Sequence, residues 1–557
     1  MMEFLRTSGR LIINESGQEI LLKGFGAGNW MNQEGFLFGS HEFNPEFKPF
    51  MRADEMDRGR SINQTIIEVC GRDYADMFWK KYYRNYFGKD DIKNLAELGF
   101  NSVRLPLNAR VLMKECPGVV YDEEVFQILD QVIDWCEYYG IYVVLDMHAA
   151  VAGQSAILCD DGVDNIPHLF IDEEGWERTM LLWEKIANRY AQRGVIAGFE
   201  LLNEPLALPT WNRYLPMLIR FYDEAIERIR KIDKKHIIFL QGHRFASRTD
   251  IYRHHYDPEC HNWVMAMHMY EVLPDLGALG PILAASSEMN VPIWMGETGG
   301  NNEYMTVLYE MLYENHIGVN VWGHKGEEHA DAALLYTFVL PEEFKMIRDY
   351  AQKGGPKPGY DKAIQIFDQF LENIKFENCK LHADRANAVL RRPDVKIPAV
   401  GYDMMPGSGK SFKGTYPYCV FSGYRREDRM HIVNEPDFMP YESPDYAFVS
   451  TEGKPKYGDW MHLELVLEEE NFVCYTIREI KRDSEILISY RAAQDCKIKI
   501  TIREKSVIVN AEASEVLTTI PVGSISEGED SAVKIECLEG KIALHTICFR
   551  WMYNAGV

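Results

Sequence analysis

Gly198-Phe199-Glu200-Leu201-Leu202-Asn203-Glu204-Pro205 is an apolar run of strand length that ends in a carboxylate, and Pro292-Ile293-Trp294-Met295-Gly296-Glu297-Thr298 is a second run of the same kind. A buried strand has no structural use for a glutamate at its carboxyl end, because burying a charge costs free energy. Two carboxyl groups about 5 to 5.5 Å apart serve a double displacement, in which one donates a proton and the other attacks. Glu204 and Glu297 are therefore the first candidates for chemistry.

On both sides of these two runs, strand-like and helix-like segments alternate from about residue 18 to residue 375. This rhythm is typical of a parallel sheet with crossover helices. Eight such units within about 360 residues fit a (β/α)8 TIM barrel with loop insertions. We predict a barrel over residues 1–378, with strands at Gln18 to Gly24, Ser102 to Leu107, Tyr142 to His148, Ala197 to Glu204, His236 to His243, Trp263 to Tyr270, Pro292 to Glu297 and Gly318 to Trp322.

Helical periodicity fills the segments between these strands. The fifth helix, near Arg248 to Tyr256, has the weakest pattern. The other expected helices cover Asp90 to Leu98, Glu123 to Tyr139, Gly175 to Arg193, Trp211 to Ile232, Glu303 to Asn315 and Asp361 to Ile374.

Polar or aromatic residues occupy six of the eight predicted strand ends. A TIM barrel carries its active site at the carboxyl ends of its strands, so this is where the fold requires functional residues. These residues are Arg104 late in the second strand, His148 at the end of the third, Asn203 and Glu204 at the fourth, His268 and Tyr270 at the sixth, Glu297 at the seventh and Trp322 at the eighth.

Taken together, these positions carry a family resemblance. The chain resembles glycoside hydrolase family 5, a group of (β/α)8 retaining β-glycosidases with catalytic glutamates after strands four and seven. The resemblance spans about residues 10 to 375. The family pattern of Arg, His, Asn-Glu-Pro, His-x-Tyr, Glu and Trp is matched by Arg104, His148, Asn203, Glu204, His268, Tyr270, Glu297 and Trp322.

The two glutamates have different expected roles. Partial burial and the neighbouring Glu297 raise the pKa of Glu204, which then stays protonated as the general acid and acts as base in the second half-reaction. Glu297 stays ionised as the nucleophile, held by the guanidinium of Arg104 and by a hydrogen bond from Tyr270.

The remaining residues of the pattern are expected to hold the sugar. Asn203 binds the 2-hydroxyl, a contact that strengthens in the transition state. His148 and His268 line the pocket as hydrogen-bonding partners. Trp322 offers a flat apolar face to the C–H surface of the sugar.

Clues to the substrate come from the segment after the first strand. Gly24 to Glu34 is similar to the stretch of exo-acting family members in which a tryptophan and a glutamate border the terminal sugar, here Trp30 and Glu34. The long segment from Gly35 to Phe87 is expected to wall one side of the barrel mouth. These features favour an exo-β-glycosidase acting on β-glucosides or short β-gluco-oligosaccharides. A diglycosidase or β-mannosidase using the same glutamates, and a non-catalytic carbohydrate-binding protein, remain as alternatives.

Beyond Lys380 the sequence changes to alternating, β-branched runs. We predict an antiparallel β-sandwich over residues 379–557. Gly458-Asp459-Trp460 and the later strands loosely resemble a jelly-roll carbohydrate-binding module, although a structural or dimer-forming domain is the favoured interpretation. The expected strands are His462 to Leu467, Phe472 to Ile480, Glu485 to Tyr490, Lys497 to Asn510, Ala532 to Cys537 and Lys541 to Arg550.

Composition excludes several classes of partner. The formal net charge of -24 disfavours nucleic acid, whose phosphates it repels. We expect no membrane span, no bound metal and no cofactor. The amino terminus lacks the pattern of a signal peptide, and the 11 cysteines show no paired spacing, so a cytoplasmic protein is expected. A small oligosaccharide or glycoside is the expected partner, and a homo-oligomer is left open.

Overall fold

The protein is described by a computed structural model that covers residues 2–40, 56–270, 272–330, 332–404, 410–416, 424–436 and 462–552. The chain divides into two compact units. The first contains residues 1–269, 284–299 and 316–382, and the second contains residues 270–283, 300–315 and 383–557. Among the described residues, no helix combines the length and the apolar character needed to cross a membrane.

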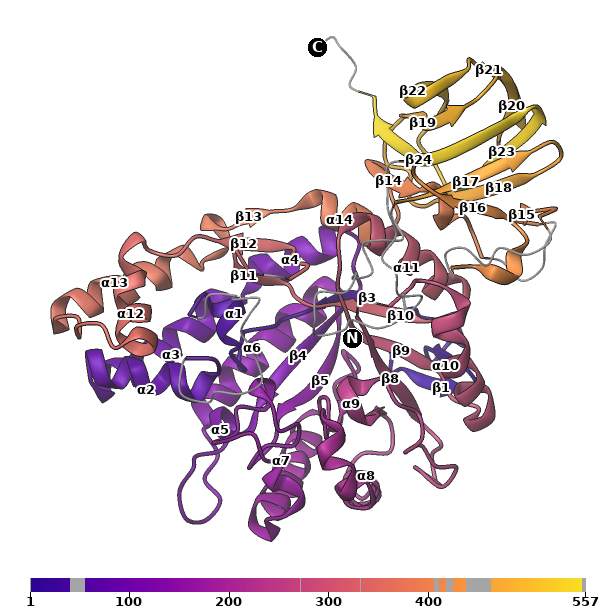
Figure 1. The fold of residues 1–557 in the computed structure, drawn as a ribbon. Helices are drawn as coiled ribbons and strands as arrows, with labels where there is room; N and C mark the ends of the chain where they lie inside the picture. The colour runs from indigo at the N-terminus through magenta and orange to yellow at the C-terminus, as the bar shows by residue number, and fades with distance from the viewer. Residues whose placement is uncertain are drawn as a thin grey trace. The chain divides into compact units, whose positions relative to one another are not determined.

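The predicted TIM barrel is confirmed. Eight parallel strands close in the order β10-β3-β4-β5-β6-β7-β8-β9, and they are lined by apolar residues on both faces because helices cover them from outside (Figure 1). The strands are β3 (Lys23–Gly26), β4 (Ser102–Asn108), β5 (Tyr142–Ala149), β6 (Ile196–Glu200), β7 (Ile237–Gln241), β8 (Trp263–Met269), β9 (Ile293–Thr298) and β10 (Gly318–Val321).

Local sequence signals set the ends of the long barrel helices. Helix α6 (Glu123–Tyr139) begins where the side chain of Asp122 accepts a hydrogen bond from the backbone N–H of Val125, and it ends at Gly140 in the left-handed conformation. The other helices between residues 35 and 373 are α1 (Gly35–Phe38), α2 (Gly59–Cys70), α3 (Arg72–Tyr86), α4 (Lys89–Glu97), α5 (Ala109–Leu112), α7 (Glu173–Tyr190), α8 (Leu215–Arg230), α9 (His243–Ala246), α10 (Leu276–Met289), α11 (Asn302–Glu314), α12 (Lys345–Lys353) and α13 (Tyr360–Asn373).

Two predicted barrel elements are wrong. Gln18 to Leu22 is not barrel strand, because Ile20 pairs back with Ile12 next to the short hairpin β1 (Arg6–Ser8) and β2 (Leu11–Ile13). Arg248 to Tyr256 forms consecutive turns and no helix. Its Tyr252 hydroxyl donates to the backbone oxygen of Leu240 on β7, which holds the segment against the strand.

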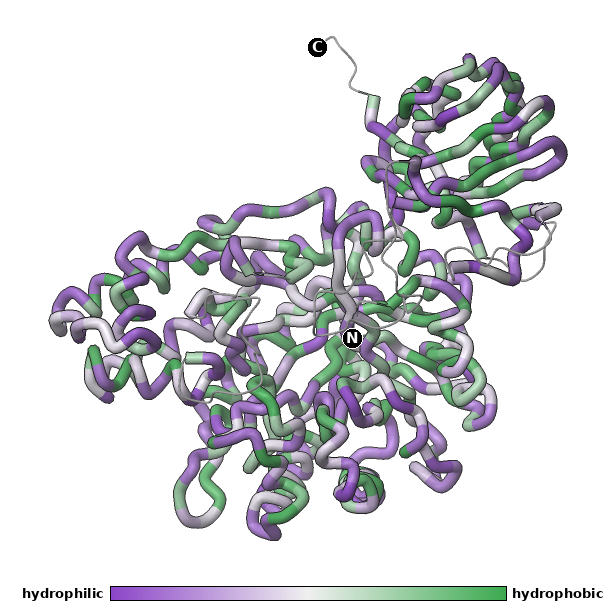
Figure 2. The backbone as a smooth tube through the Cα atoms, in the orientation of Figure 1, coloured by the Kyte–Doolittle hydropathy of each residue, from purple (hydrophilic) through white to green (hydrophobic). Residues whose placement is uncertain are grey.

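The second unit contains two antiparallel sheets, as predicted for the region after residue 379. Two long strands, one in each sheet, alternate between buried and more exposed residues, which is typical of a sheet with one buried face, and hydrophobic and hydrophilic residues mix along the sheets (Figure 2). The helix α14 (Ala383–Val389) leads into this region. One sheet contains β14 (Val395–Pro398), β16 (His431–Asn434), β17 (Leu463–Glu468), β19 (Ser484–Ala492), β22 (Ser514–Ile525) and β24 (Lys541–Trp551), and the other contains β15 (Phe412–Lys413), β18 (Phe472–Ile477), β20 (Cys496–Ile502), β21 (Lys505–Ala511) and β23 (Ser531–Glu539).

Two details of this region differ from the prediction. Lys497 to Asn510 is a hairpin of two strands, because Arg503 adopts a positive φ of 56° at the turn. Strand β22 was not predicted, since most of its residues are polar or exposed and lack a clear alternation. Gly458-Asp459-Trp460 lies outside the described residues.

Candidate active site

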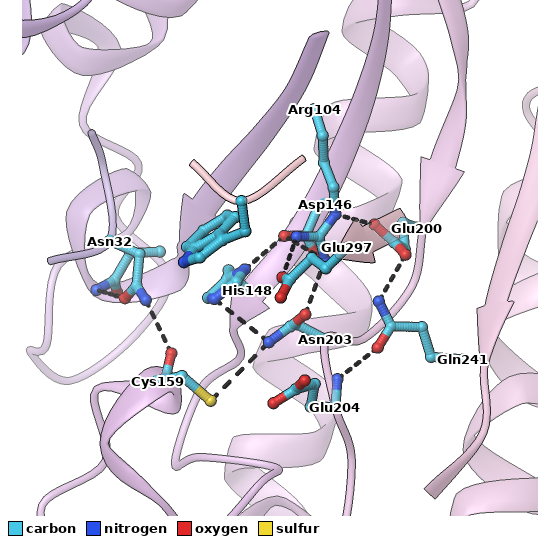
Figure 3. A network of polar contacts seen from close by, with 12 residues as sticks. Asn32, Arg104, Asp146, His148, Cys159, Glu200, Asn203, Glu204, Gln241 and Glu297 are labelled. Carbon is cyan, nitrogen blue, oxygen red and sulfur yellow. Dashed lines mark hydrogen bonds and ion pairs between the residues drawn. The ribbon is translucent and has the colours of Figure 1, made fainter. Parts of the chain in front are cut away.

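The predicted polar residues of β4, β5, β8 and β9 and of the segment after β6 converge at one site. Figure 3 shows Arg104, His148, Asn203, Glu204 and Glu297 of this set. His268 and Glu297 lie within β8 and β9, whereas Asn203 and Glu204 follow the end of β6 at Glu200. The prediction that Arg104 lies late in its strand is wrong, because it is the third residue of β4. Its long side chain nevertheless spans the distance to the site.

Arg104 organises the centre of this site. It is fully buried, and its Nε donates to Glu200 Oε2 at 2.6 Å while its Nη1 donates to Glu297 Oε1 at 2.5 Å. Its Nη2 donates to Asn203 Oδ1 at 2.7 Å and lies 3.0 Å from Asp146 Oδ2. Such charge-assisted bonds are short and strong. Arg104 therefore fixes the proposed nucleophile and the residue beside the proposed acid with a single side chain.

Glu204 sits in a local backbone conformation that requires support. Its φ is 41°, in the left-handed region that β-carbon-bearing residues rarely adopt, and its N–H donates to Gln241 Oε1 at 2.7 Å. Its Oε1 lies 2.8 Å from His268 Nδ1. Burial raises the pKa of Glu204 to about 7, with the positive charge of Arg104 opposing and the negative charge of Glu200 adding to the rise. A carboxyl group of this kind is suited to donate a proton near neutral pH.

Glu297 lies close enough to Glu204 for the two to act on one atom. A side-chain oxygen of each glutamate and a ring nitrogen of His268 all lie within 4.8 Å of one another. Nδ1 of His268 is 3.4 Å from Glu297 Oε2. A separation of about 5 Å is typical of retaining glycosidases, whereas inverting enzymes keep their carboxyl groups about 6.5 to 9.5 Å apart.

The ring of His148 is held in one tautomer by its neighbours. Its Nδ1 lies 2.7 Å from Asp146 Oδ2, and a carboxylate accepts the N–H at that position. Asn203 uses its oxygen to accept from Arg104, so its Nδ2 faces His148 Nε2, at 3.3 Å. Burial lowers the pKa of His148 to about 3. His148 is therefore a neutral ring that orients the amide of Asn203.

Glu34 and Trp322 form one wall of the site. The ring of His148 stacks on Trp322, with centroids 5.0 Å apart and planes 4° apart. Trp322 Nε1 donates to Glu34 Oε2 at 3.3 Å. Glu34 is only 6% exposed, and burial, followed by the charges of Glu297 and Glu204, raises its pKa to about 8. Glu34 therefore lies near the two glutamates, whose charges act on it.

Trp30 is placed differently from expectation, whereas Tyr270 lies at the end of its strand as predicted. Trp30 is fully buried, its Nε1 donates to the backbone oxygen of Tyr83, and its ring packs beside Phe87. The prediction that Trp30 binds substrate is therefore wrong: its hydrogen-bonding group and its faces are used by the core. Tyr270 directly follows β8, is 36% exposed, and belongs to the second compact unit.

A loop after β5 is tied by hydrogen bonds to the start of α2 and by an ion pair to α5. Nη1 of Arg58 donates to the backbone oxygen of Gly162, and Asp161 accepts from the backbone N–H of Arg60 at 2.6 Å and from Arg110 Nε at 2.7 Å. Part of the predicted wall from Gly35 to Phe87 thus supports this loop through α2. Residues 41–55 of the predicted wall lie outside the described residues.

Sequence reasoning missed several residues that support the site. Asp146 precedes His148 by two residues and therefore points to the same side of β5, a signal that period-two spacing provides. Gln241 is the last residue of β7, where the barrel fold also predicts functional residues. Glu200 and Gln154 give no such signal, because their roles depend on contacts made in three dimensions. Gln154 Nε2, for example, donates to the backbone oxygens of His148 and Asn203.

Glu204, His268 and Glu297 have the residue types of a metal site, since each offers an oxygen or nitrogen ligand. Arg104 already donates to Glu297 at 2.5 Å, so a positive charge is supplied by the protein at this point. A cation bound there is repelled by the guanidinium. The donor set fits proton transfer and nucleophilic attack better than metal binding.

Comparison with known proteins is consistent with this geometry. Residues 57–328 match the family model described as Cellulase (glycosyl hydrolase family 5). A β-xylosidase of Phanerodontia chrysosporium is 32% identical over 289 residues, which are 52% of this chain and 56% of that protein. Endoglucanase C of Acetivibrio thermocellus is 27% identical over 175 residues, or 31% of this chain and 48% of that protein.

The chain spans about half the length of these curated relatives. Among solved structures, rutinosidase from Aspergillus niger aligns with a TM-score of 0.45 and 14% identity, covering 56% of this chain and 92% of that one. A likeness of this size supports no assignment of function.

Proposed function

We propose that this chain, whose residues 57–328 form a glycosyl hydrolase family 5 domain, is a retaining exo-β-glycosidase that hydrolyses β-glucosides or short β-gluco-oligosaccharides. The observation that carries the proposal is the pair of buried glutamates whose oxygens lie within 4.8 Å of one another and of one histidine nitrogen. This spacing suits a covalent glycosyl intermediate and leaves too little room for an inverting water.

In the first half-reaction, Glu297 attacks the anomeric carbon while Glu204 protonates the departing oxygen. The bond from carbon to the leaving oxygen breaks, a bond to Glu297 forms, and the proton of Glu204 leaves with the alcohol. Arg104 keeps Glu297 in position for attack, because its Nη1 is anchored by the Glu297 Oε1 contact at 2.5 Å. The raised pKa of Glu204, about 7, keeps a protonated fraction available at neutral pH.

In the second half-reaction, Glu204 acts as the base. It removes a proton from water as the oxygen attacks the anomeric carbon, and Glu297 is released as a carboxylate. Asn203 supports both steps: its Oδ1 accepts from Arg104, and its Nδ2 lies between His148 Nε2 at 3.3 Å and Cys159 Sγ at 3.9 Å. A donor at this position suits the 2-hydroxyl of the sugar, whose contact strengthens in the transition state.

Exo action is supported by Glu34. A nearly buried carboxyl group that accepts from Trp322 Nε1 and lies 4.0 Å from His148 Nε2 places a polar group beside the sugar site. Such a group pairs with the hydroxyls of a terminal sugar. The name of the β-xylosidase relative also favours removal of single sugars, and it makes β-xylosides a second substrate class to test.

The proposal is tested by assaying the purified protein with aryl β-glucosides, β-xylosides, β-mannosides and β-diglycosides, and identifying each released sugar by mass. Release of glucose with retained β-configuration is expected, the configuration being read by NMR of the first-formed product. Release of intact disaccharides favours the diglycosidase, and release of mannose favours the β-mannosidase.

Inactivity on every substrate, together with measurable binding of the same sugars by calorimetry, contradicts hydrolysis and favours a non-catalytic carbohydrate-binding protein. A first product of inverted configuration contradicts the double displacement even if the sugar is the expected one, because inversion requires a single displacement by water.

A further inference from the structure

Gln241 makes three hydrogen bonds at the centre of the site and has no place in the reaction described above. Its Oε1 accepts from the backbone N–H of Glu204 at 2.7 Å. Its Nε2 lies 2.6 Å from Glu200 Oε1 and 3.0 Å from His268 Nε2. The side chain is fully buried at the end of β7, between Glu204 and Glu200 (Figure 3).

The orientation of this amide is determined by its partners. A backbone N–H is only a donor, so the atom of Gln241 that faces Glu204 N must be the oxygen. The nitrogen of the amide then faces Glu200 and His268. It carries two hydrogens, which matches its two acceptors.

We infer that Gln241 is a positioning residue that fixes His268 as the neutral tautomer with its proton on Nδ1. The amide hydrogen of Gln241 occupies the lone pair of His268 Nε2, which therefore cannot carry a proton. The proton on Nδ1 then points at Glu204 Oε1, 2.8 Å away, with Glu297 Oε2 at 3.4 Å. This inference rests on the proposed function for its catalytic meaning.

This arrangement determines which oxygen of Glu204 carries the acid proton. Because His268 donates to Oε1, the proton of the neutral Glu204 resides on Oε2. After the first half-reaction the same donor stabilises the carboxylate form of Glu204. Gln241 thus acts on Glu204 twice, through the backbone N–H and through His268.

Burial keeps the ring of His268 neutral by lowering its pKa to about 4, and the nearest charged groups are Glu297, Arg104 and Glu200. The negative charges of the glutamates oppose this lowering and the positive charge of Arg104 assists it. The geometry of Gln241 decides the tautomer within that neutral state.

The direct test is NMR of the intact protein with ¹⁵N-labelled histidine, in which protonated and unprotonated ring nitrogens have distinct shifts. His268→Asn identifies the signals by their loss. The wild-type protein is expected to show His268 protonated at Nδ1 alone near neutral pH. Gln241→Met removes the donor and is expected to give a mixture of tautomers, while Gln241→Glu offers an acceptor to Nε2 and moves the proton there.

Gln154→Met is the matched control. Gln154 is an equally buried glutamine, but it bonds to the backbone of His148, Ala150 and Asn203 and to the hydroxyl of Ser155, with no contact to His268. This variant is expected to leave the tautomer of His268 unchanged. Thermal unfolding of each variant separates a folding defect from an effect on the site.

Kinetics provide the second readout. Gln241→Met is expected to lower kcat by about 100-fold on glycosides with poor leaving groups, and much less on activated aryl glycosides, because misplacement of the acid affects only the substrates that need its proton. A wild-type protein protonated at Nε2, or a Gln241→Met variant with the wild-type tautomer and kinetics, overturns the inference. The tautomer is measured without substrate, so inactivity of the wild-type protein contradicts the proposed function alone.

Discussion

Two fully buried arginines, Arg104 in the barrel and Arg391 in the second unit, each sit among carboxylates, yet the two surroundings differ in one respect. In the second unit, Glu310 accepts from Arg478 through both oxygens, at 2.7 and 3.1 Å. Asp403 lies 3.0 Å from Arg391 Nη2 and accepts from the backbone and hydroxyl of Thr476. Every oxygen of these two carboxylates has a protein partner.

In the barrel network, Glu204 has fewer hydrogen-bond partners than its carboxyl group can accept. Glu204 Oε1 lies 2.8 Å from His268 Nδ1, whereas Glu204 Oε2 has no hydrogen-bond partner among the described residues. Burial raises the pKa values of Glu204 and Glu34 to about 7 and about 8. Burial also raises the pKa of Glu310, so the two networks differ in the number of donors to their carboxylates and not in the direction of the pKa shift. A saturated buried network holds a fold together, whereas an incompletely satisfied one retains capacity for a substrate.

Replacing Glu297 in the barrel network is expected to cause the largest loss of turnover. Glu297→Ala removes the nucleophile, so turnover of every glycoside should fall on the order of 10⁴-fold or more, since no other group can form the covalent intermediate. Steady-state assays with azide as an external nucleophile provide the check. Azide is expected to restore cleavage and to give a glycosyl azide of inverted configuration. Wild-type turnover without azide contradicts the assignment.

Replacing Glu204 tests the incompletely satisfied carboxylate itself. Glu204→Ala should reduce kcat/KM by about 10² to 10⁴-fold for alkyl glycosides, which need protonation, and far less for nitrophenyl glycosides. The measurement is a series of leaving groups of graded acidity. An equal loss across the whole series means that Glu204 supports the site without donating the proton.

Replacing Glu310 tests the saturated network. Glu310→Gln removes the buried carboxylate that accepts from Arg478 through both oxygens, and breaking a buried ion pair costs about 3 to 5 kcal/mol of stability. Asp530 still pairs with Arg478 and Asp403 with Arg391, so we expect the loss to lie toward the lower end of this range. We expect a lower midpoint in chemical denaturation, measured for the second unit by local fluorescence. kcat of the folded protein should stay at the wild-type value. Loss of kcat without loss of stability contradicts the structural role given to this network.

Burial patterns explain which parts of the fold were predictable from the sequence. The barrel strands are continuous apolar runs, so their period and order were predictable, and the two glutamates stand out because they end such runs. Trp30 was misassigned because a tryptophan beside a strand end has the same sequence context whether its ring faces the core or a pocket. Strand β22 was missed because exposed polar residues carry no burial pattern.

The partners of the site residues were harder to predict than the residues themselves. Gln241 and Glu200 act through bonds across neighbouring strands, and 41 positions separate them in the sequence. Which polar residue meets which depends on strand register and on side-chain orientation. Neither follows from residue type alone, so the supporting layer of the site became visible only in three dimensions.

The smallest expected effect is a shift of the pH profile. Glu204 must be protonated to act as acid, so kcat/KM for poor leaving groups should fall about tenfold per pH unit above a limb near pH 7, which is the pKa of Glu204. Glu200 contributes to this raised pKa through its negative charge. Glu200→Gln removes that charge, makes ionisation of Glu204 easier, and should move the limb to lower pH. A limb that moves to higher pH contradicts this electrostatic coupling and shows that the two networks differ in something other than the balance of charge.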